Sequence, residues 1–404
     1  MLRSMTPASS LPQTPRHRGL TYLLGSLVSL PTMAMTLIAP AIPEVRAEFG
    51  ASYNEAQLLV TLFLASMAVG LLFVGLISDR LGRRPVFLIG GTLFFASSLI
   101  GYFAPSIIVL ILARMAQGLS AAALVTTGRI IANDIFAGKD ASRALSSVTA
   151  VQSIVPVLSL ALGGVIVEQF GWRTCFSIMA VFSAIILVQS YAFIPETNQN
   201  KLAHLRLTAL AEAFGTVLGS RLWQLYAFCA GLHIGMFYAM NGYMSYHFAR
   251  LGASVTEFGF YYSTISLGYL IGNLVNRRLV AALSLGQCVL IGCWVTLIAI
   301  AIMWAGDEAG LLTPLLLAGL LSTIGFAHGL IVANAIISSL SDMGRHTGSA
   351  NGIGAALHMV IGGIAGSLII SLGGATNFWI CMVANAMMSV LSIIAIKRAM
   401  RYAS

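Results

Sequence analysis

The segment Gly75-Leu-Ile-Ser-Asp79-Arg80-Leu-Gly82-Arg83-Arg84-Pro85 decides the fold, because it is a short charged stretch between two long apolar runs. The runs lie at about 56–78 and 86–105. Each is long enough to cross a bilayer as a helix, which takes about 20 residues. Glycine and positive charge between them predict a tight turn on the cytoplasmic side of a membrane.

The composition of the whole chain excludes water as its main solvent. Of 404 residues, 58% are hydrophobic and 9% are charged, whereas a soluble domain carries about 25% charged residues. The apolar runs predict an all-α membrane protein with twelve transmembrane helices. The predicted spans are 20–42, 56–78, 86–105, 107–131, 142–167, 173–194, 222–248, 258–276, 284–305, 311–339, 348–371 and 376–396.

The distribution of basic residues predicts the orientation. A net charge of +9 would suggest nucleic acid as a partner of a soluble chain, but these residues lie in loops, where lipid headgroups are the expected partners. Counted from a cytoplasmic N-terminus, 17 of the 22 lysines and arginines fall on the cytoplasmic side and 3 on the other; Arg114 and Arg129 lie within spans. We expect a multi-pass protein of a bacterial inner (plasma) membrane, with both termini cytoplasmic and no nucleic-acid partner.

The spans divide into two sets of six. Residues 195–221 form the longest polar interruption, and Gly75-Leu-Ile-Ser-Asp79-Arg80 recurs as Gly272-Asn-Leu-Val-Asn276-Arg277, displaced by 197 residues. A repeat of this kind indicates two related halves. We predict a cytoplasmic tail at 1–19, an N-terminal bundle at 20–194, a cytoplasmic linker at 195–221, a C-terminal bundle at 222–396 and a cytoplasmic tail at 397–404.

The charged turn resembles the signature loop of the major facilitator superfamily. The resemblance implies two pseudo-symmetric six-helix bundles, the major facilitator fold. It also implies a cytoplasmic gate, in which Asp79 faces the start of the eleventh helix near Gly348 and an arginine of the loop pairs with Asp134. The gate residues are then Gly75, Asp79, Arg80, Gly82, Arg83, Arg84 and Asp134. The alternative is that the basic residues only anchor the chain at the membrane surface.

The fourth span resembles a second motif of the family. Arg114-Met-Ala-Gln117 places Arg114 and Gln117 on one helical face, and an arginine inside an apolar span usually faces a polar cavity. The resemblance gives this arginine a role in substrate binding or proton coupling. The alternative is that Arg114 snorkels to the outer surface.

The fifth span resembles the antiporter motif of drug:proton antiporters. Gln152, Pro156, Ser159 and Gly163-Gly164 recur at helical spacing and form a small, kinkable face. One proline of the usual motif is replaced by Leu160. A generic packing face is the alternative.

Several short segments resemble the Bcr/CflA drug-resistance branch, among them Pro40-Ala-Ile-Pro43, Gly171-Trp172-Arg173 and His346-Thr347-Gly348-Ser349-Ala350. That branch carries an acid in the first span, and Thr36 is its nearest counterpart here. All 13 carboxylates fall in loops or at span ends. A cavity with Arg114 and no acid is expected to favour neutral or anionic cargo, such as amphenicols or carboxylate siderophores.

Histidines offer a substitute for the missing acid. His233, His328 and His358 lie in the seventh, tenth and eleventh spans, and histidine titrates near neutral pH; the alternative for each is a hydrogen-bonded interhelical histidine. Tyr238 and Asn241 fit a ligand pocket or an interfacial belt. The predicted midplane cavity for substrate and proton contains Thr36, Arg114, Gln117, Gln152, His233, Tyr238, Asn241, His328 and His358.

These features predict a secondary active transporter that exports small molecules of the drug or siderophore type by proton antiport with alternating access. No nucleotide-binding loop, metal-ligand spacing or catalytic constellation is present in the sequence, so we expect no cofactor, no metal and no enzymatic activity, with a proton gradient as the energy source. The carrier is expected to act as a monomer. The alternatives are a proton-coupled uptake symporter and, from another class, a receptor or scaffold that does not transport.

Overall fold

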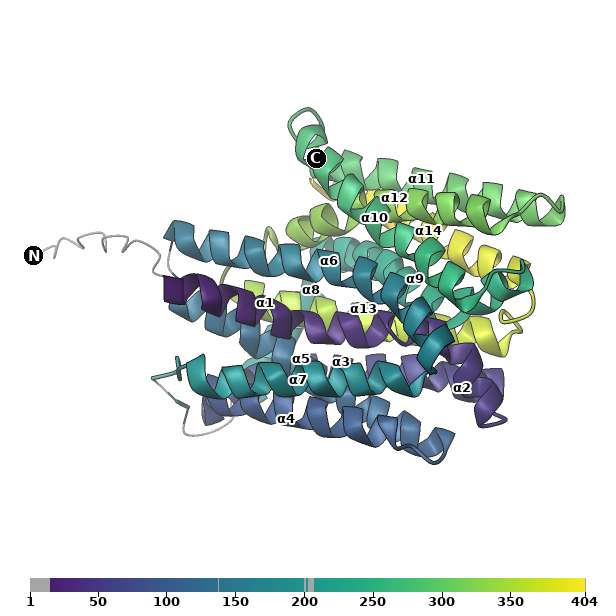
Figure 1. Ribbon diagram of the computed structural model, residues 1–404. Helices are drawn as coiled ribbons and strands as arrows, with labels where there is room; N and C mark the ends of the chain where they lie inside the picture. The colour runs from purple at the N-terminus through teal and green to yellow at the C-terminus, as the bar shows by residue number, and fades with distance from the viewer. Residues whose placement is uncertain (1–14, 137, 200, 203–206, 404) are drawn as a thin grey trace, which may run out of the picture.

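The predicted number and order of long helices is found in the structure. The structure, a computed structural model, describes residues 15–136, 138–199, 201–202 and 207–403. Twelve helices of these residues have 20 residues or more (Figure 1). They are α1 (Pro15–Thr36), α3 (Tyr53–Leu81), α4 (Arg83–Tyr102), α5 (Ile107–Ile135), α6 (Gly138–Phe170), α7 (Arg173–Phe193), α9 (Arg221–Arg250), α10 (Val255–Leu279), α11 (Leu285–Glu308), α12 (Pro314–Leu340), α13 (Thr347–Ser371) and α14 (Phe378–Ala403).

The first span differs from the predicted helix over 20–42. Helix α1 starts earlier, at Pro15, and ends at Thr36; the short helices η1 (Ala39–Ala41) and α2 (Ile42–Glu48) follow it. Pro40 and Pro43 stand at the starts of the two short helices, where a residue without an N–H is tolerated but cannot continue the helix before it. Of the predicted tail at 1–19, residues 1–14 lie outside the described residues and the remainder belongs to α1.

Two predicted polar segments are partly helical. The linker at 195–221 contains α8 (Leu207–Gly219), whose Ala213 and Val217 are buried and which packs against α13. Helix α14 continues through the predicted C-terminal tail to Ala403. Both differences have one cause, because alanine, leucine and basic residues are good helix formers and a polar composition does not by itself end a helix.

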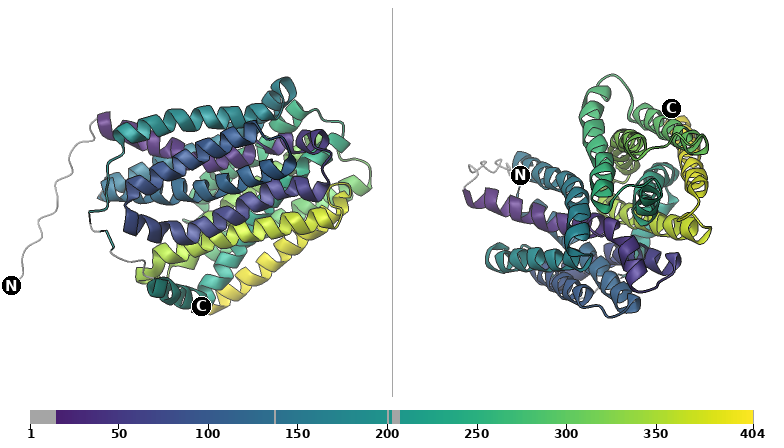
Figure 2. Two further views of the ribbon diagram at one scale, coloured as in Figure 1. Left: turned by 90° about the horizontal axis from the view of Figure 1, so that it is seen from below. Right: turned by 45° about the vertical axis from the view of Figure 1, so that its right-hand side comes forward.

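The long helices form two bundles, α1–α7 and α9–α14, which the right-hand view of Figure 2 shows as two groups. The bundles contact each other mainly through two helix pairs, α3 with α13 and α6 with α10. If the two halves of the chain are exchanged, α3 corresponds to α10 and α13 corresponds to α6, so each pair is the counterpart of the other. The helix starts repeat as well: Ser52 with Glu55 on α3, and Ser254 with Glu257 on α10, each form a reciprocal capping box. The internal repeat is therefore structural.

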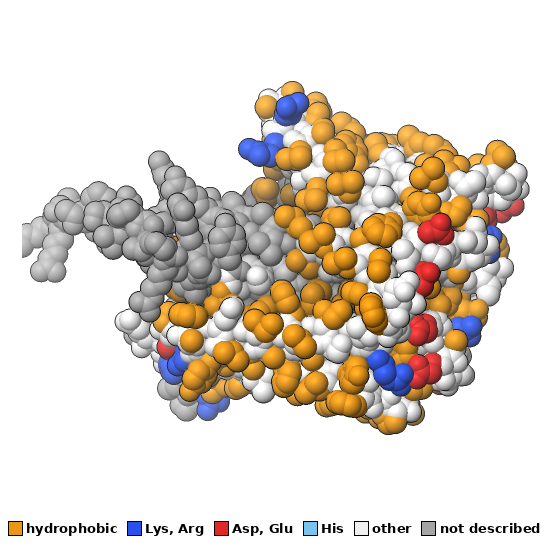
Figure 3. Space-filling model, viewed as in Figure 1, with side chains coloured by type: hydrophobic (Ala, Val, Ile, Leu, Met, Phe, Trp, Pro, Cys, Tyr) orange, Lys and Arg blue, Asp and Glu red, His pale blue; other side chains and the backbone are white. Residues whose placement is uncertain are grey.

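The outer surface of the bundles is apolar. Nine helices among the described residues are long and apolar enough to cross a membrane, and large hydrophobic side chains on them are exposed. Figure 3 shows hydrophobic side chains over the middle of the molecule and charged side chains near its ends. Helix α9 is not among the nine, because it carries buried polar side chains such as His233, Asn241 and His247 that face the protein interior.

Candidate functional site

The signature turn is held inside the N-terminal bundle. At Gly82 the backbone has φ +108°, which allows α3 to turn directly into α4. Arg83 Nη1 lies 2.5 Å from the Asp79 carboxylate and donates to Ser78 Oγ, while its Nε is 3.8 Å from the Asp134 carboxylate. The structure thus brings together Asp79, Arg83 and Asp134, three of the predicted gate residues.

Other parts of the predicted gate differ from the predicted arrangement. The Asp79 carboxylate pairs with Arg83 rather than with the start of α13. A Cβ placed on Gly75 would meet no atom within 4 Å, so no helix approaches closely there. Arg80 is exposed, and Arg84 donates to the Tyr191 carbonyl at 2.7 Å. The cluster is therefore a contact among α3, α4 and α5 in this conformation.

Glu196 is a member of this site that the sequence did not indicate. Its carboxylate accepts hydrogen bonds from the backbone N–H groups of Arg83 and Asn198, both at 2.9 Å. Asn198 Nδ2 donates to the Asp79 carbonyl at 2.9 Å, and the backbone N–H of Leu202 donates to the same carbonyl at 3.1 Å. The start of the linker is thereby tied to the turn. No local sequence pattern marks Glu196, because its partner in the turn, Arg83, is 113 residues away in the chain.

We expect Glu196→Ala to release the linker from the turn. Loss of two hydrogen bonds to a carboxylate costs about 1–2 kcal/mol, or roughly five- to thirtyfold in the local opening equilibrium. Trypsin should then cleave after Lys201 faster by a factor in that range, while the helical content stays the same. Gln199→Ala, in the same segment, is the matched control, since the exposed Gln199 side chain makes none of these contacts. Equal cleavage rates in both variants would contradict the assignment.

The two bundles pack more tightly toward one end than toward the other. We call the end with Gly82 and residues 194–199 the linker end, and the end with Ser52 and Ser254 the far end. Near the far end, Thr61 Oγ1 of α3 is 2.8 Å from Ser367 Oγ of α13. Toward the linker end a Cβ placed on Gly352 would lie 3.7 Å from the Leu71 carbonyl, and one on Gly348 would meet nothing within 4 Å.

The second helix pair repeats this geometry. Near the far end, a Cβ on Gly164 of α6 would lie 2.6 Å from the Val255 carbonyl and 2.9 Å from Gly259 Cα of α10. The Glu168 carboxylate accepts a 2.6 Å hydrogen bond from the backbone N–H of Thr256. Figure 1 shows α6 and α10 crossing near this end and separating toward the other. Gly164 of the predicted antiporter motif thus lies at the bundle interface, whereas a Cβ on Gly163 would face Leu37 within the N-terminal bundle.

Arg114 and its neighbours lie inside the N-terminal bundle, not on the wall of a cavity as predicted. The Arg114 side chain is 0% exposed and donates to the Leu59 carbonyl, the Ala34 carbonyl and Gln117 Oε1 at 2.8–3.1 Å. Ala34 lies in the last turn of α1, whose final carbonyls lack partners within the helix. Arg114 therefore caps α1 and offsets its negative end.

Thr36 and Gln117 share that buried environment. Thr36 is 0% exposed and donates back to the Thr32 carbonyl at 2.9 Å, a local contact that an ionised acid at this position could not make. Gln117 Nε2 donates to Ser98 Oγ at 2.9 Å. Neither side chain reaches the space between the bundles.

Gln152 and Tyr238 are brought together with an arginine that the sequence analysis left without a role. Arg129 Nη2 of α5 donates to Gln152 Oε1 of α6 at 3.2 Å, and Gln152 Nε2 donates to the Val28 carbonyl of α1 at 3.1 Å. Tyr238 of α9 lies within electrostatic range of Arg129 and packs against the core of the N-terminal bundle. This cluster joins the two bundles at mid-depth, while Pro156 lies one turn farther along α6, partly buried.

The histidines form a separate cluster within the C-terminal bundle. The His233 and His328 rings meet edge to face, with centroids 5.3 Å apart, and His233 Nε2 is 3.5 Å from Cys293 Sγ. His233 Nδ1 and His328 Nε2 have no hydrogen-bond partner in the described part of the chain. His358 of α13 faces α9 at Gly231. Asn241 is buried farther along α9, where its Nδ2 donates to the Phe237 carbonyl.

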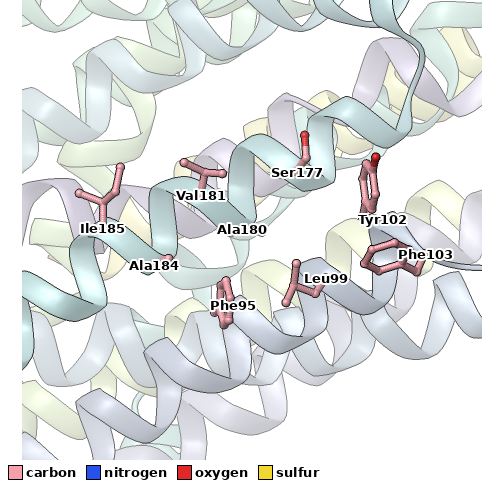
Figure 4. A pocket seen from close by; sticks show the side chains of 9 residues that line it. All are labelled: Phe95, Leu99, Tyr102, Phe103, Ser177, Ala180, Val181, Ala184 and Ile185. Carbon is pink, nitrogen blue, oxygen red and sulfur yellow. The ribbon is translucent and has the colours of Figure 1, made fainter.

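A groove of about 320 Å³ on the surface lies away from all these residues. It runs between α4 and α7 and is lined by apolar side chains such as Phe95, Leu99 and Val181 (Figure 4). The groove contains none of the predicted site residues and lies within one bundle. An acyl chain of a lipid fits such a surface, so we do not assign it to the transport path.

Comparison with known proteins decides the family. The sequence model described as Major Facilitator Superfamily matches residues 24–249. The chain belongs to the Major Facilitator Superfamily. Its structure resembles the crystal structure of a D-xylose-proton symporter, with a TM-score of 0.73 and 16% identity over 93% of this chain and 96% of that one. A bacterial homolog of the lysosomal transporter Spinster, in an inward-facing and unoccupied conformation, gives a TM-score of 0.67 at 15% identity over 96% and 94%.

Similar sequences come from bacterial transporters of this superfamily. A bicyclomycin resistance protein homolog of Haemophilus influenzae is 27% identical over 86% of this chain and 88% of its own. A chloramphenicol resistance protein of Pseudomonas aeruginosa is 26% identical over 88% and 85%, and multidrug resistance protein D of Escherichia coli is 25% identical over 81% and 87%. The predicted all-helical major facilitator fold and the Bcr/CflA resemblance are confirmed. The chain is a multi-pass membrane transporter in a lipid environment, and not an enzyme.

Proposed function

We propose that the protein exports drug-like small molecules from a bacterial cytoplasm by proton antiport with alternating access. The observation that carries the proposal is the bundle interface, which is tight toward the far end and looser toward the linker end. A carrier needs two such states, related by rocking of one bundle against the other. Most basic residues lie at the linker end, which favours a cytoplasmic position for this end and a conformation whose looser side faces the inside.

The direction and the cargo rest on the relatives. Those that resemble the whole chain include proteins named for resistance to bicyclomycin and chloramphenicol, and resistance is the expected result of export. No carboxylate of the described residues lies within the bundle interior, which favours neutral or anionic molecules over cations. We expect the transporter to act as a monomer, because all the proposed parts belong to one chain.

Transport by inverted vesicles tests this function. An imposed proton gradient, acid inside, should drive accumulation of chloramphenicol or bicyclomycin, and collapse of the gradient should release it. Accumulation in right-side-out vesicles instead would indicate uptake by symport. Binding of the drug without its movement in either orientation would indicate a receptor. Uptake by symport and binding without transport would each overturn the proposal.

The histidine pair is the proposed proton carrier. Two imidazolium groups 5 Å apart repel, so His233 and His328 hold one proton at a time. Among the described residues, the titratable groups facing the pair are Cys293 and its neighbour Cys229, and no carboxylate is among them. The pair can therefore release its proton without leaving an unpaired buried anion.

We expect His328→Asn to uncouple transport from the proton gradient. Proton-driven accumulation should fall by at least about tenfold, because the remaining imidazole lacks its partner, whereas passive movement down a cargo gradient should persist. Cargo flux measured in proteoliposomes with and without a pH gradient distinguishes proton-driven accumulation from passive movement. His346→Asn, at the start of α13, is the control. Retention of full proton-driven accumulation in His328→Asn would exclude the pair as carrier.

A further inference from the structure

Arg129 differs from the other arginine of the same helix. Both lie within α5, 15 residues or about 22 Å apart along its axis. Arg114 is fully enclosed, with backbone and side-chain acceptors around its guanidinium. Arg129 is an exposed residue although its partners lie on helices of the bundle interior. The first arginine is part of the packing, and the second presents a charge to solvent.

The surroundings of Arg129 identify the space that it faces. Arg129 donates a hydrogen bond to Gln152 of α6, and Tyr238 of α9, from the opposite bundle, lies within electrostatic range of it. Helix α5 has no extensive packing contact with α9, so Arg129 and Tyr238 approach each other through their side chains, one from each bundle. Side chains tilt toward the N-terminal end of their helix, which directs the guanidinium away from the linker end and toward the midplane.

The ion pairs among the described residues leave the charge of Arg129 without a carboxylate. A guanidinium has five N–H donors in a planar fork, of which one is used by Gln152. An unpaired charge at this depth is costly and is retained where it faces a polar pathway or a ligand. Gln152 is itself fixed by the Val28 carbonyl, so the fork is held in one orientation.

We propose that Arg129, oriented by Gln152, binds the carboxylate of an organic anion that the protein transports. A carboxylate matches the guanidinium fork with two parallel hydrogen bonds. Tyr238 adds an aromatic ring and a hydroxyl from the other bundle, so an aromatic carboxylate between them contacts both bundles. The inference rests on the proposed transport function and names the substrate class of that same space.

Competition between matched compounds tests the inference. Salicylate and salicylamide differ chiefly in the carboxylate, and each is added to vesicles that accumulate chloramphenicol. In the wild type, salicylate should inhibit at lower concentration than salicylamide. Arg129→Gln should weaken inhibition by salicylate by about ten- to a hundredfold, the expected loss for a bidentate charged hydrogen bond, and leave salicylamide within about twofold. Arg129→Lys should retain part of the effect.

Two further variants keep the result interpretable. Gln152→Glu supplies an internal carboxylate for Arg129 and should abolish the preference for salicylate with the arginine still in place. Arg398→Gln removes an exposed charge at the end of α14 and should change neither inhibitor. Equal inhibition by the two compounds in the wild type, or a preference for salicylate that survives in Arg129→Gln, would overturn the inference while export of chloramphenicol stands. Absence of chloramphenicol transport in the wild type would overturn the proposed function as well.

Discussion

Gly164→Ala is expected to slow transport by about five- to 150-fold. The added methyl group would lie 2.6 Å from the Val255 carbonyl and 2.9 Å from Gly259 Cα. Both are backbone atoms, so the helices themselves must separate. Overpacking of this kind costs about 1–3 kcal/mol, which corresponds to that shift in the equilibrium between the closed and open far end. The state described here would lose population to the state open at the far end.

Thiol labelling measures the shift directly. All five native cysteines are buried, so a Thr61→Cys side chain at the α3–α13 contact provides a reporter for a membrane-impermeant reagent. Labelling from the far end should rise together with the loss of transport. Gly319→Ala is the matched control, because it lies on an exposed face of α12 and its added methyl group would meet nothing within 4 Å. It should change neither the labelling nor the transport rate. Unchanged labelling in Gly164→Ala would show that the glycine contact is not required for closure.

Arg114→Ala is expected to lower the free energy of unfolding by about 3–5 kcal/mol, the range for a large buried side chain removed from its partners. Removing a buried charge by itself is favourable, but the change leaves the Ala34 carbonyl and Gln117 Oε1 without their donor. It also removes the positive charge from the end of α1 and leaves a cavity beside Phe63, whose ring lies 4.2 Å from the guanidinium carbon. The unpaired acceptors, the lost charge at the end of α1 and the cavity cost more free energy than removal of the buried charge gains.

Thermal unfolding in detergent, followed by a thiol-reactive dye that reports exposure of the buried cysteines, measures this cost. Asn133→Ala is the control on the same helix, and its exposed side chain predicts a change within about 0.5 kcal/mol. Equal stability of the two variants would contradict the capping role. Loss of transport in Arg114→Ala, if stability falls as expected, reports the fold and not the cargo site.

The sequence predicted the architecture because hydrophobic length and charge asymmetry are local properties. Twelve long helices, the turn at Gly82 and the proximity of Arg83 to Asp134 all follow from a helix count and one motif. The break after Thr36 was missed, although Pro40 and Pro43 supplied the signal for it. A run of apolar residues does not show where a helix is interrupted.

The candidate site was less predictable, because its residues are distinguished by distant partners. Arg114 and Arg129 are both arginines within one apolar span. Arg114 meets the end of α1, and Arg129 meets Gln152 and the opposite bundle. Only tertiary packing decides which of them is enclosed. Glu196 was missed for the same reason, since nothing in its neighbourhood points to Arg83.

The position of Asp79 is occupied in the second half by Asn276. There the partner is Asn334, whose amide exchanges two hydrogen bonds with Asn276, at 2.8 and 3.2 Å. The N-terminal half instead holds Asp79, Arg83 and Asp134 in one group of charges. Ionic strength at the linker end weakens attraction between charges and leaves amide pairs almost unaffected. The two bundles thus share their helix arrangement but differ in charge at these equivalent positions. Added salt should weaken the contact in the N-terminal bundle and leave the equivalent contact in the C-terminal bundle unchanged.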